Sequence, residues 1–173
     1  MPRIAASKRP SRPLIEIRAA RRRDAPKILA FIRALAAYER LSHEVVADEA
    51  ALRKALFGKR RAAEVLIGRL DGTDAGFAVF FQSFSTFLGR PGLFLEDLFV
   101  EPKYRGRGLG RALLLKLARI ARERGCGRLE WNVLDWNDDA RRFYVGLGAT
   151  EKKEWRLFRV AGSALTRLGT MHG

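Results

Sequence analysis

Hydrophobic and polar residues alternate along the chain with the spacings of strands and amphipathic helices. Period-two alternation and short apolar runs predict strands over residues 14–18, 63–70, 76–84, 93–100, 128–134 and 154–160. Apolar residues three and four positions apart predict helices over residues 24–40, 48–57, 109–124 and 138–147. The strand over residues 76–84 is apolar on both faces, because Phe77 and Val79 alternate with Ala78 and Phe80. We therefore expect it at the centre of a sheet that is covered on both sides.

Turn and capping residues mark the boundaries of these elements. Asp71-Gly72 predicts a tight hairpin between the second and third strands. Asp24 and Asn137 are expected to cap the helices that follow them. The order βααβββαβαβ mixes hairpins with crossovers, so we expect an α+β fold. Its centre would be a mixed, twisted β-sheet flanked by helices on both faces.

Length and composition indicate one domain. The chain has 173 residues, of which 47% are apolar. Residues 1–13 are basic and lack the apolar region of a secretory signal, so we expect a disordered extension before a single domain over residues 14–168. No apolar run approaches the roughly 20 residues that span a bilayer, and no membrane association is expected. Cys126 is the only cysteine, which excludes an internal disulfide and is compatible with the cytoplasm.

The charge balance is strongly basic. The formal net charge is +15, from 34 Lys and Arg residues against 19 Asp and Glu residues. Such a balance favours anionic partners such as phosphorylated cofactors, nucleic acid or a membrane surface. Because no helix-turn-helix, zinc-finger or RNA-recognition pattern occurs, we do not expect nucleic acid binding. A non-catalytic domain that binds nucleic acid or a protein partner through its basic surface remains the alternative.

The sequence Arg105-Gly106-Arg107-Gly108-Leu109-Gly110, here called the glycine loop, lies between a predicted strand and a predicted helix. Glycines allow backbone N–H groups to approach a ligand, and the helix N-terminus favours an anion such as a pyrophosphate. A flexible turn is the structural alternative. The spacing matches neither a Walker loop nor a dinucleotide fingerprint. It does match the pattern [QR]-x-x-G-x-[GA], read as Arg105, Gly108 and Gly110.

This pattern resembles the acetyl-CoA pyrophosphate loop of the GNAT superfamily of N-acetyltransferases. Five further segments resemble its diamine and thialysine N-epsilon-acetyltransferase branch, and they occur in the same order along the chain. These segments are residues 37–42, 94–100, 133–137, 143–149 and 155–158. The resemblance implies the GNAT fold, acetyl-CoA as co-substrate without a metal, direct transfer of the acetyl group to a primary amine of a small molecule, and a homodimer.

The resemblance also implies where acetyl-CoA binds. Leu98, Phe99 and Val100 would present backbone groups to the pantetheine in the manner of strand addition. The expected contacts of the pyrophosphate and of the rest of coenzyme A are Arg105, Gly106, Arg107, Gly108, Leu109, Gly110, Arg111, Asn137, Asp138, Asp139 and Ala140.

Acetyl transfer requires that the amine lose its proton and that the leaving thiolate gain one. The resemblance assigns the first task to Glu96, directly or through water, and the second to Tyr144 as general acid. A surface carboxylate and a core tyrosine beside Phe143 are the structural alternatives. Strand alternation predicts that Glu96 and Asp97 point to opposite faces.

The resemblance places Tyr38, Glu39, Glu96 and Asp97 at the acceptor amine. Residues 85–90 are similar to the thialysine branch. Diamine acetyltransferases typically carry an acidic residue and a tryptophan where this chain has Ser85 and Phe87, and an acidic residue where it has Lys153. The expected acceptors are a thialysine-like or lysine-like amino acid, or a diamine or polyamine.

Overall fold

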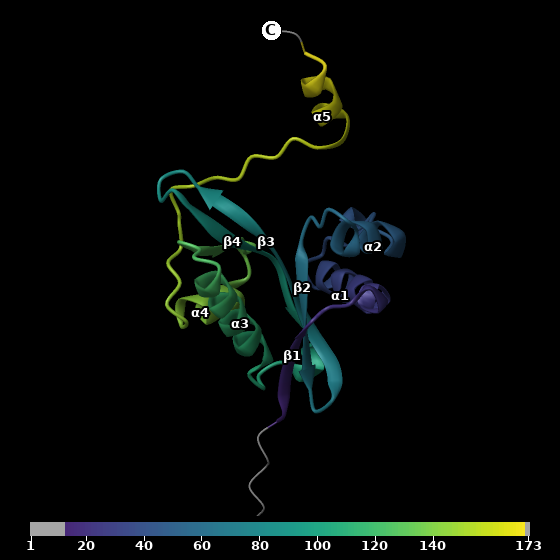
Figure 1. Ribbon diagram of the computed structural model, residues 1–173, viewed down its shortest axis with the longest axis vertical. Coiled ribbons are helices and arrows are strands. Elements are labelled where there is room, and N and C mark those ends of the chain that lie inside the picture. Colours follow the sequence, from purple (N-terminus) through teal and green to yellow (C-terminus); the bar gives the residue numbers. More distant parts are fainter. Residues whose placement is uncertain (1–12, 172–173) are drawn as a thin grey trace, which may run out of the picture. The chain divides into compact units, whose positions relative to one another are not determined.

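The computed structural model describes residues 13–171 and divides into two compact units (Figure 1). The first unit reaches to Asn132, and the second begins at Val133. All but the last residue of the expected N-terminal extension lies outside the described residues. Among the residues that are described, no helix is long and apolar enough to cross a membrane.

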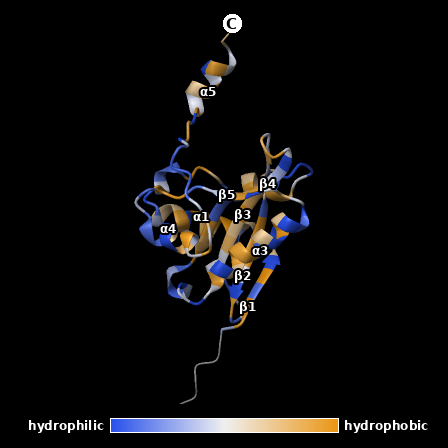
Figure 2. Ribbon diagram, turned by 90° about the vertical axis from the view of Figure 1, so that its left-hand side faces the viewer, coloured by the Kyte–Doolittle hydropathy of each residue, from blue (hydrophilic) through white to orange (hydrophobic). Residues whose placement is uncertain are grey.

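The first unit contains a five-stranded sheet in the order β1-β2-β3-β4-β5. The strands are β1 (Ile15–Ala19), β2 (Glu64–Leu70), β3 (Thr73–Ser85), β4 (Arg90–Val100) and β5 (Leu129–Trp131). The first four strands pair antiparallel, whereas β5 pairs parallel to β4 over three residues. The predictions of a mixed sheet and of a central third strand are therefore confirmed. Figure 2 shows hydrophobic residues along β3, in keeping with its central position.

Helices cover both faces of this sheet, as predicted (Figure 1). On one face, α1 (Ala25–Tyr38) and α2 (Glu49–Phe57) contribute Ile28, Phe31 and Leu56 to a core with Phe77 and Phe99. The rings of Phe31 and Phe77 stack with centroids 5.4 Å apart. On the other face, α3 (Leu109–Glu123) packs Leu109 and Leu113 over Gly68. A Cβ on Gly68 would come within 2.9 Å of the Leu109 side chain, so a larger residue there would push α3 away.

Short 3-10 helices connect several of these elements, and they are η1 (Arg22–Asp24), η2 (Ser42–Glu44) and η3 (Pro102–Tyr104). The predicted hairpin is confirmed, because Leu70 pairs with Thr73 around Asp71 and Gly72. Both turn residues have positive φ, 50° and 81°, which is typical of a type I′ turn.

The prediction that Asp24 caps α1 is wrong, because its side chain makes no capping hydrogen bond to that helix. Its carboxylate instead accepts hydrogen bonds from the Arg18 guanidinium at 2.6 Å and from the backbone N–H of Arg21 at 2.7 Å. Because Asp24 is 8% exposed, a charged donor from β1 outcompetes the helix N–H groups that a solvated cap would bind. The bond to Arg18 lowers the pKa of Asp24 and ties β1 to the start of α1.

The second unit differs more from prediction. The helix α4 (Asp138–Val145) begins as expected at Asn137, whose side chain accepts from the N–H of Ala140 at 3.2 Å. The strand predicted over residues 154–160 is wrong, because these residues form no strand and leave Trp155 and Phe158 71% and 88% exposed. Alternation favours a strand only where a neighbour accepts its backbone hydrogen bonds. A helix that was not predicted, α5 (Gly162–Gly169), follows.

Replacing Asp24 by asparagine tests the ion pair between Arg18 of β1 and Asp24 at the start of α1. We expect Asp24→Asn to lower the free energy of unfolding by about 1–3 kcal/mol at pH 7, since Arg18 loses a charged acceptor that is buried. The folded pKa is lowered, so the stabilisation exists above the unfolded pKa and is lost as the pH falls through the folded value. Urea unfolding at pH 7 and at pH 2 measures both effects.

Glu16→Gln is the matched control, because Glu16 pairs with Arg69 at 3.1 Å but is about half exposed. An equal loss in both variants, or a loss in Asp24→Asn that persists at pH 2, would contradict the role assigned to Asp24.

Candidate functional site

A β-bulge in β4 determines the geometry of the site. Val79 of β3 pairs with Asp97, and the next residue, Phe80, pairs with Leu95. Glu96 therefore has no partner on β3 and is the extra residue of the bulge. The sheet pairing of β4 with β5 covers only residues 93–95, so it ends just before the bulge.

The bulge brings both carboxylates to the same face of the sheet. Asp97 shares a face with its partner Val79, whose side chain belongs to the core beneath α1. Phe94 pairs with Phe81, two residues from Val79, and therefore lies on that same face. Two residues beyond Phe94, Glu96 returns to the α1 face. The prediction of opposite faces is wrong, because the extra residue interrupts the alternation.

Glu39, Glu96 and Asp97 form what we call the acidic cluster. Burial, and then repulsion from Glu96 and Glu39, raises the pKa of Asp97 to about 6. Burial also raises the pKa of Glu39. Carboxylates that repel one another favour a cation near them. An alkylammonium group is a cation that such a site can accept.

The end of α1 positions the acceptor corner, a name used here for Tyr38 and Glu39. The N–H of Leu41 donates to the carbonyl of Ala36 at 2.8 Å, and the N–H of Arg40 donates to that of Ala37 at 3.2 Å. These two bonds form a Schellman motif with Arg40 in the left-handed region at φ 63°. A non-glycine residue is strained in this conformation, so contacts with surrounding residues must stabilise the end of the helix.

The glycine loop has the backbone that the sequence predicts. Gly106 and Gly108 have φ values of 72° and 90°, which disfavour any residue with a Cβ. Gly108 is the N-cap residue of α3 and provides no side chain to cap it. The N–H groups of the first turn thus lack a side-chain acceptor from this position, as an anion site at a helix N-terminus requires.

The arginines of the loop have partners that sequence reasoning missed. Arg107 forms an ion pair with Asp71 of the β2–β3 turn at 2.6 Å. The Nε of Arg105 donates to the carbonyl of Val100 at 3.0 Å, and the guanidinium lies 4.4 Å from the centroid of the Tyr38 ring. No local sequence signal connects Tyr38 with Arg105, because they meet only in the folded chain.

The end of β4 offers backbone groups to a ligand. Residues 98–100 pair with β3 along one edge. Along the opposite edge, the pairing with β5 that the structure describes stops at Leu95. An extended ligand can bind such an edge in the manner of strand addition, as expected for Leu98, Phe99 and Val100.

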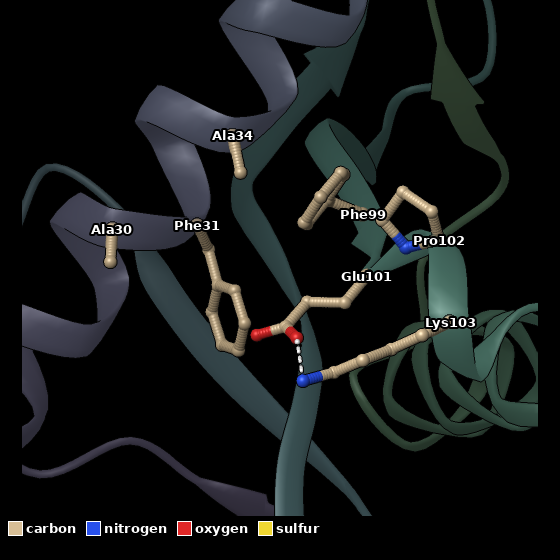
Figure 3. A pocket seen from close by; sticks show the side chains of 7 residues that line it. All are labelled: Ala30, Phe31, Ala34, Phe99, Glu101, Pro102 and Lys103. Atoms are coloured by element: carbon tan, nitrogen blue, oxygen red, sulfur yellow. Dashed lines mark ion pairs between the residues drawn. The ribbon is translucent and has the colours of Figure 1, made fainter.

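A pocket of about 390 Å³ opens between α1 and the segment after β4 (Figure 3). Phe31, Phe99 and Glu101 are among its lining residues. The Glu101 carboxylate lies 3.0 Å from the Nζ of Lys27 and 3.5 Å from that of Lys103. Two cations thus compensate this carboxylate, so the pocket lacks the excess negative charge of the acidic cluster.

The remaining predicted residues lie in the second unit. Asn137 caps α4, and Ala140 supplies the N–H that it accepts. Asp138 pairs with Arg141 at 3.0 Å, and Asp139 pairs with Arg142. Tyr144 packs against Phe143 within α4, with ring centroids 5.2 Å apart. The structure thus brings together Tyr38, Glu39, Glu96 and Asp97 in the first unit, and it describes Asn137 and Tyr144 within the second.

No group of three or more His, Cys, Asp or Glu residues arranged to hold a metal ion occurs within residues 13–171. The chemistry available to the described site is that of carboxylates, arginines, a tyrosine and backbone N–H groups.

Comparisons with known proteins identify a family and several relatives that this chain resembles. The model of the acetyltransferase (GNAT) family matches residues 28–149. A thialysine N-epsilon-acetyltransferase from Bos taurus is 38% identical over 165 residues, which cover 89% of this chain and 96% of that protein. An L-ornithine N5-acetyltransferase from Arabidopsis thaliana is 32% identical over 201 residues and covers 90% of this chain and 88% of its own.

Solved structures show the same fold. An integron cassette protein from the mobile metagenome of V. cholerae superposes with a TM-score of 0.76 at 26% identity, covering 91% of this chain and 98% of its own. An aminoglycoside N-acetyltransferase in complex with CoA reaches a TM-score of 0.68 at 19% identity, covering 87% and 97%. The fold expected from the sequence is therefore confirmed.

The raised pKa of Asp97 predicts a specific effect on stability. Its folded pKa of about 6 exceeds the unfolded value of about 3.9, so ionised Asp97 destabilises the fold increasingly as the pH rises between these values. We expect Asp97→Asn to raise the free energy of unfolding at pH 7.5 by up to about 3 kcal/mol. The gain should vanish near pH 4, where the wild-type carboxyl is protonated.

Urea unfolding at the two pH values measures this difference. Asp135→Asn, which removes an exposed carboxylate of the second unit, is the control and should change little at either pH. A loss of stability in Asp97→Asn at pH 7.5 would show that Asp97 is not held in a repulsive site.

Proposed function

The chain belongs to the acetyltransferase (GNAT) family and is an N-acetyltransferase for a small-molecule amine, and from this premise we propose that it acetylates the side-chain amine of a lysine-like amino acid such as thialysine. The relatives named thialysine and L-ornithine acetyltransferases support this class of acceptor. The observation that carries the proposal is the acidic cluster on the α1 face of the bulged strand, because it offers an ammonium group several carboxylates.

The β3–β4 hairpin favours an amino acid over a diamine or polyamine. Ser85 is buried, and its Oγ accepts a weak hydrogen bond from the N–H of Leu88 at 3.3 Å, so it stabilises the turn. Phe87 is 90% exposed and carries no charge. A second ammonium group would therefore meet no carboxylate from Ser85 or Phe87, and Lys153 supplies a positive charge where diamine acetyltransferases typically carry an acidic residue.

GNAT acetyltransferases use acetyl-CoA as the acetyl donor. We propose that the glycine loop binds its pyrophosphate through the backbone N–H groups of residues 106–111, with Arg105 and Arg107 adding charge. Leu98, Phe99 and Val100 would hold the pantetheine along the edge of β4 that β5 leaves uncovered. Asn137, Asp138, Asp139 and Ala140 are assigned to coenzyme A on the resemblance of their segment.

The proposed reaction is direct attack within a ternary complex. The ammonium group binds at the acidic cluster and passes a proton to Glu96, directly or through water, while Asp97 and Glu39 hold the amine. The nitrogen lone pair then attacks the thioester carbonyl, the C–S bond breaks, and the nitrogen releases its second proton to solvent as the amide forms. Tyr144 donates its phenol proton to the departing thiolate, and the phenolate then regains a proton from solvent.

Tyr144→Phe tests the proton donor. We expect kcat to fall about 100-fold or more, since general acid catalysis typically contributes a factor of that order. The Kd for acetyl-CoA should change little, because the phenyl ring and its packing against Phe143 are retained. Steady-state kinetics together with titration calorimetry separate the two quantities, and unchanged kcat would remove the assigned role.

The acceptor is tested by measuring coenzyme A release from acetyl-CoA against a panel of amines. We expect turnover with thialysine, lysine or ornithine, and a kcat/KM at least tenfold lower with putrescine and spermidine. An aminoglycoside and a basic peptide complete the panel. Preference for a polyamine would overturn the choice of acceptor, and absence of acetyl-CoA binding would overturn the enzyme mechanism.

The non-catalytic alternative, binding of nucleic acid or a protein through the basic surface, has no comparable support. The relatives and the glycine loop favour the enzyme. Salt-dependent DNA binding that is lost on removal of residues 1–23, in a protein that does not bind acetyl-CoA, would favour the alternative instead.

We also propose that the enzyme is a cytoplasmic homodimer. The homodimer follows from the resemblance, and the exposed Trp155 and Phe158 offer apolar area for a partner chain to cover. Cys126 is a free thiol, as is compatible with a reducing compartment. Sedimentation of the purified chain measures the oligomeric state.

A further inference from the structure

Arg105 belongs to the glycine loop, which is proposed to bind acetyl-CoA, and it contacts the acceptor corner, which is proposed to bind the amine. We propose that it is a positioning residue that couples the glycine loop to the acceptor corner, so that acetyl-CoA and the amine strengthen each other's binding. This inference rests on the proposed function. It assigns to Arg105 a task beyond that of a phosphate contact.

The contacts of Arg105 span three segments of the first unit. Its Nε donates to the carbonyl of Val100, the last residue of β4, at 3.0 Å. Its guanidinium carbon lies 4.4 Å from the ring centroid of Tyr38 at the end of α1. The ring of Phe99 lies 5.8 Å away. The side chain of Arg105, a residue of the glycine loop, thus contacts both the end of β4 and the acceptor corner.

The chemistry of guanidinium allows these contacts to coexist with a bound phosphate. Arginine has five N–H donors, and the bond to Val100 uses the one on Nε. The N–H donors on the two Nη groups remain able to bind an anion, while the flat face of the guanidinium stays on the Tyr38 ring. Lysine could not replace it, because an ammonium group has no flat face or fork of donors.

The acceptor corner has a geometry that such a contact can stabilise. Tyr38 is 37% exposed, and the helix ends beyond it through Arg40 in a strained left-handed conformation. Glu39, the next residue after Tyr38, is one of the carboxylates that repel Asp97. A phosphate that fixes the guanidinium therefore also fixes the Tyr38 ring and, through it, the position of Glu39 in the acidic cluster.

Coupling of this kind is reciprocal. If acetyl-CoA orders the acceptor corner, a residue of that corner must contribute to the affinity for acetyl-CoA by the same factor. A plain phosphate contact makes a different prediction, in which changes at Tyr38 leave the binding of acetyl-CoA unaltered. The two possibilities can therefore be separated at a residue that lies outside the glycine loop.

The test uses the full-length chain and titration calorimetry with acetyl-CoA. We expect Tyr38→Leu to raise the Kd about 5- to 20-fold, because the guanidinium loses its aromatic support. Tyr38→Phe keeps a ring beneath the guanidinium and should stay within about twofold of the wild type. In the background of Arg105→Lys, Tyr38→Leu should have almost no further effect, since the contact is already lost.

Kinetics provide the reciprocal measurement. Arg105→Lys should raise the KM for thialysine several-fold even when acetyl-CoA is saturating, with a smaller change in kcat. Arg124→Lys is the matched control, because Arg124 also lies over an aromatic ring, that of Phe80 at 5.8 Å, but on the α3 face. Thermal unfolding of every variant identifies any that fail to fold.

Each outcome has one meaning. A Kd in Tyr38→Leu within twofold of the wild type, or additive effects of the two substitutions, overturns the coupling. Turnover by the wild type together with either result leaves the proposed function intact and removes only this inference. A wild-type chain that binds no acetyl-CoA overturns the proposed function itself.

Discussion

The bulge at Glu96 is the constraint on which the rest of the site depends. One extra residue in β4 places two successive carboxylates on the α1 face, where regular alternation would have sent one of them into the α3 face. The same point ends the sheet pairing with β5, so that the backbone of residues 98–100 stays available along that edge. A single irregularity therefore provides both an acidic cluster and an open strand edge. The glycine loop begins five residues after Val100, the last residue of β4, and offers a site for an anion.

The site is locally acidic, whereas the chain as a whole is strongly basic. The net charge is +15, yet the cluster of Glu39, Glu96 and Asp97 is locally acidic. Several arginines of the first unit are neutralised by carboxylates close to them, as in the pairs Arg18–Asp24 and Arg124–Glu64. Salt screens Coulomb interactions over about 8–10 Å. The nearby carboxylates therefore affect the binding energy of an amine more than the distant excess of positive charge does. A global basic field can thus attract acetyl-CoA while the cluster selects a cation.

The elements that local signals specify could be predicted. Asp71-Gly72 forms its hairpin, Asn137 caps α4 through the N–H of Ala140, and the glycine loop has its positive φ values. Errors occurred where a distant partner decides the outcome. Asp24 binds Arg18 of β1 instead of capping α1, and residues 154–160 alternate like a strand without forming one. The bulge at Glu96 belongs to this class, because the register of two strands creates it and neither strand alone encodes it.

The same distinction explains why the donor is easier to infer than the acceptor. Binding of a pyrophosphate needs one contiguous turn and a helix N-terminus, and both are present in residues 105–111. Recognition of an amine at the proposed site needs residues from α1 and from the bulge of β4, which are brought together only by folding. One substitution in such a dispersed set changes the number of carboxylates that an ammonium group would meet. Because a charge without a partner is costly, the proposed choice of an amino acid over a polyamine needs changes at only a small set of positions.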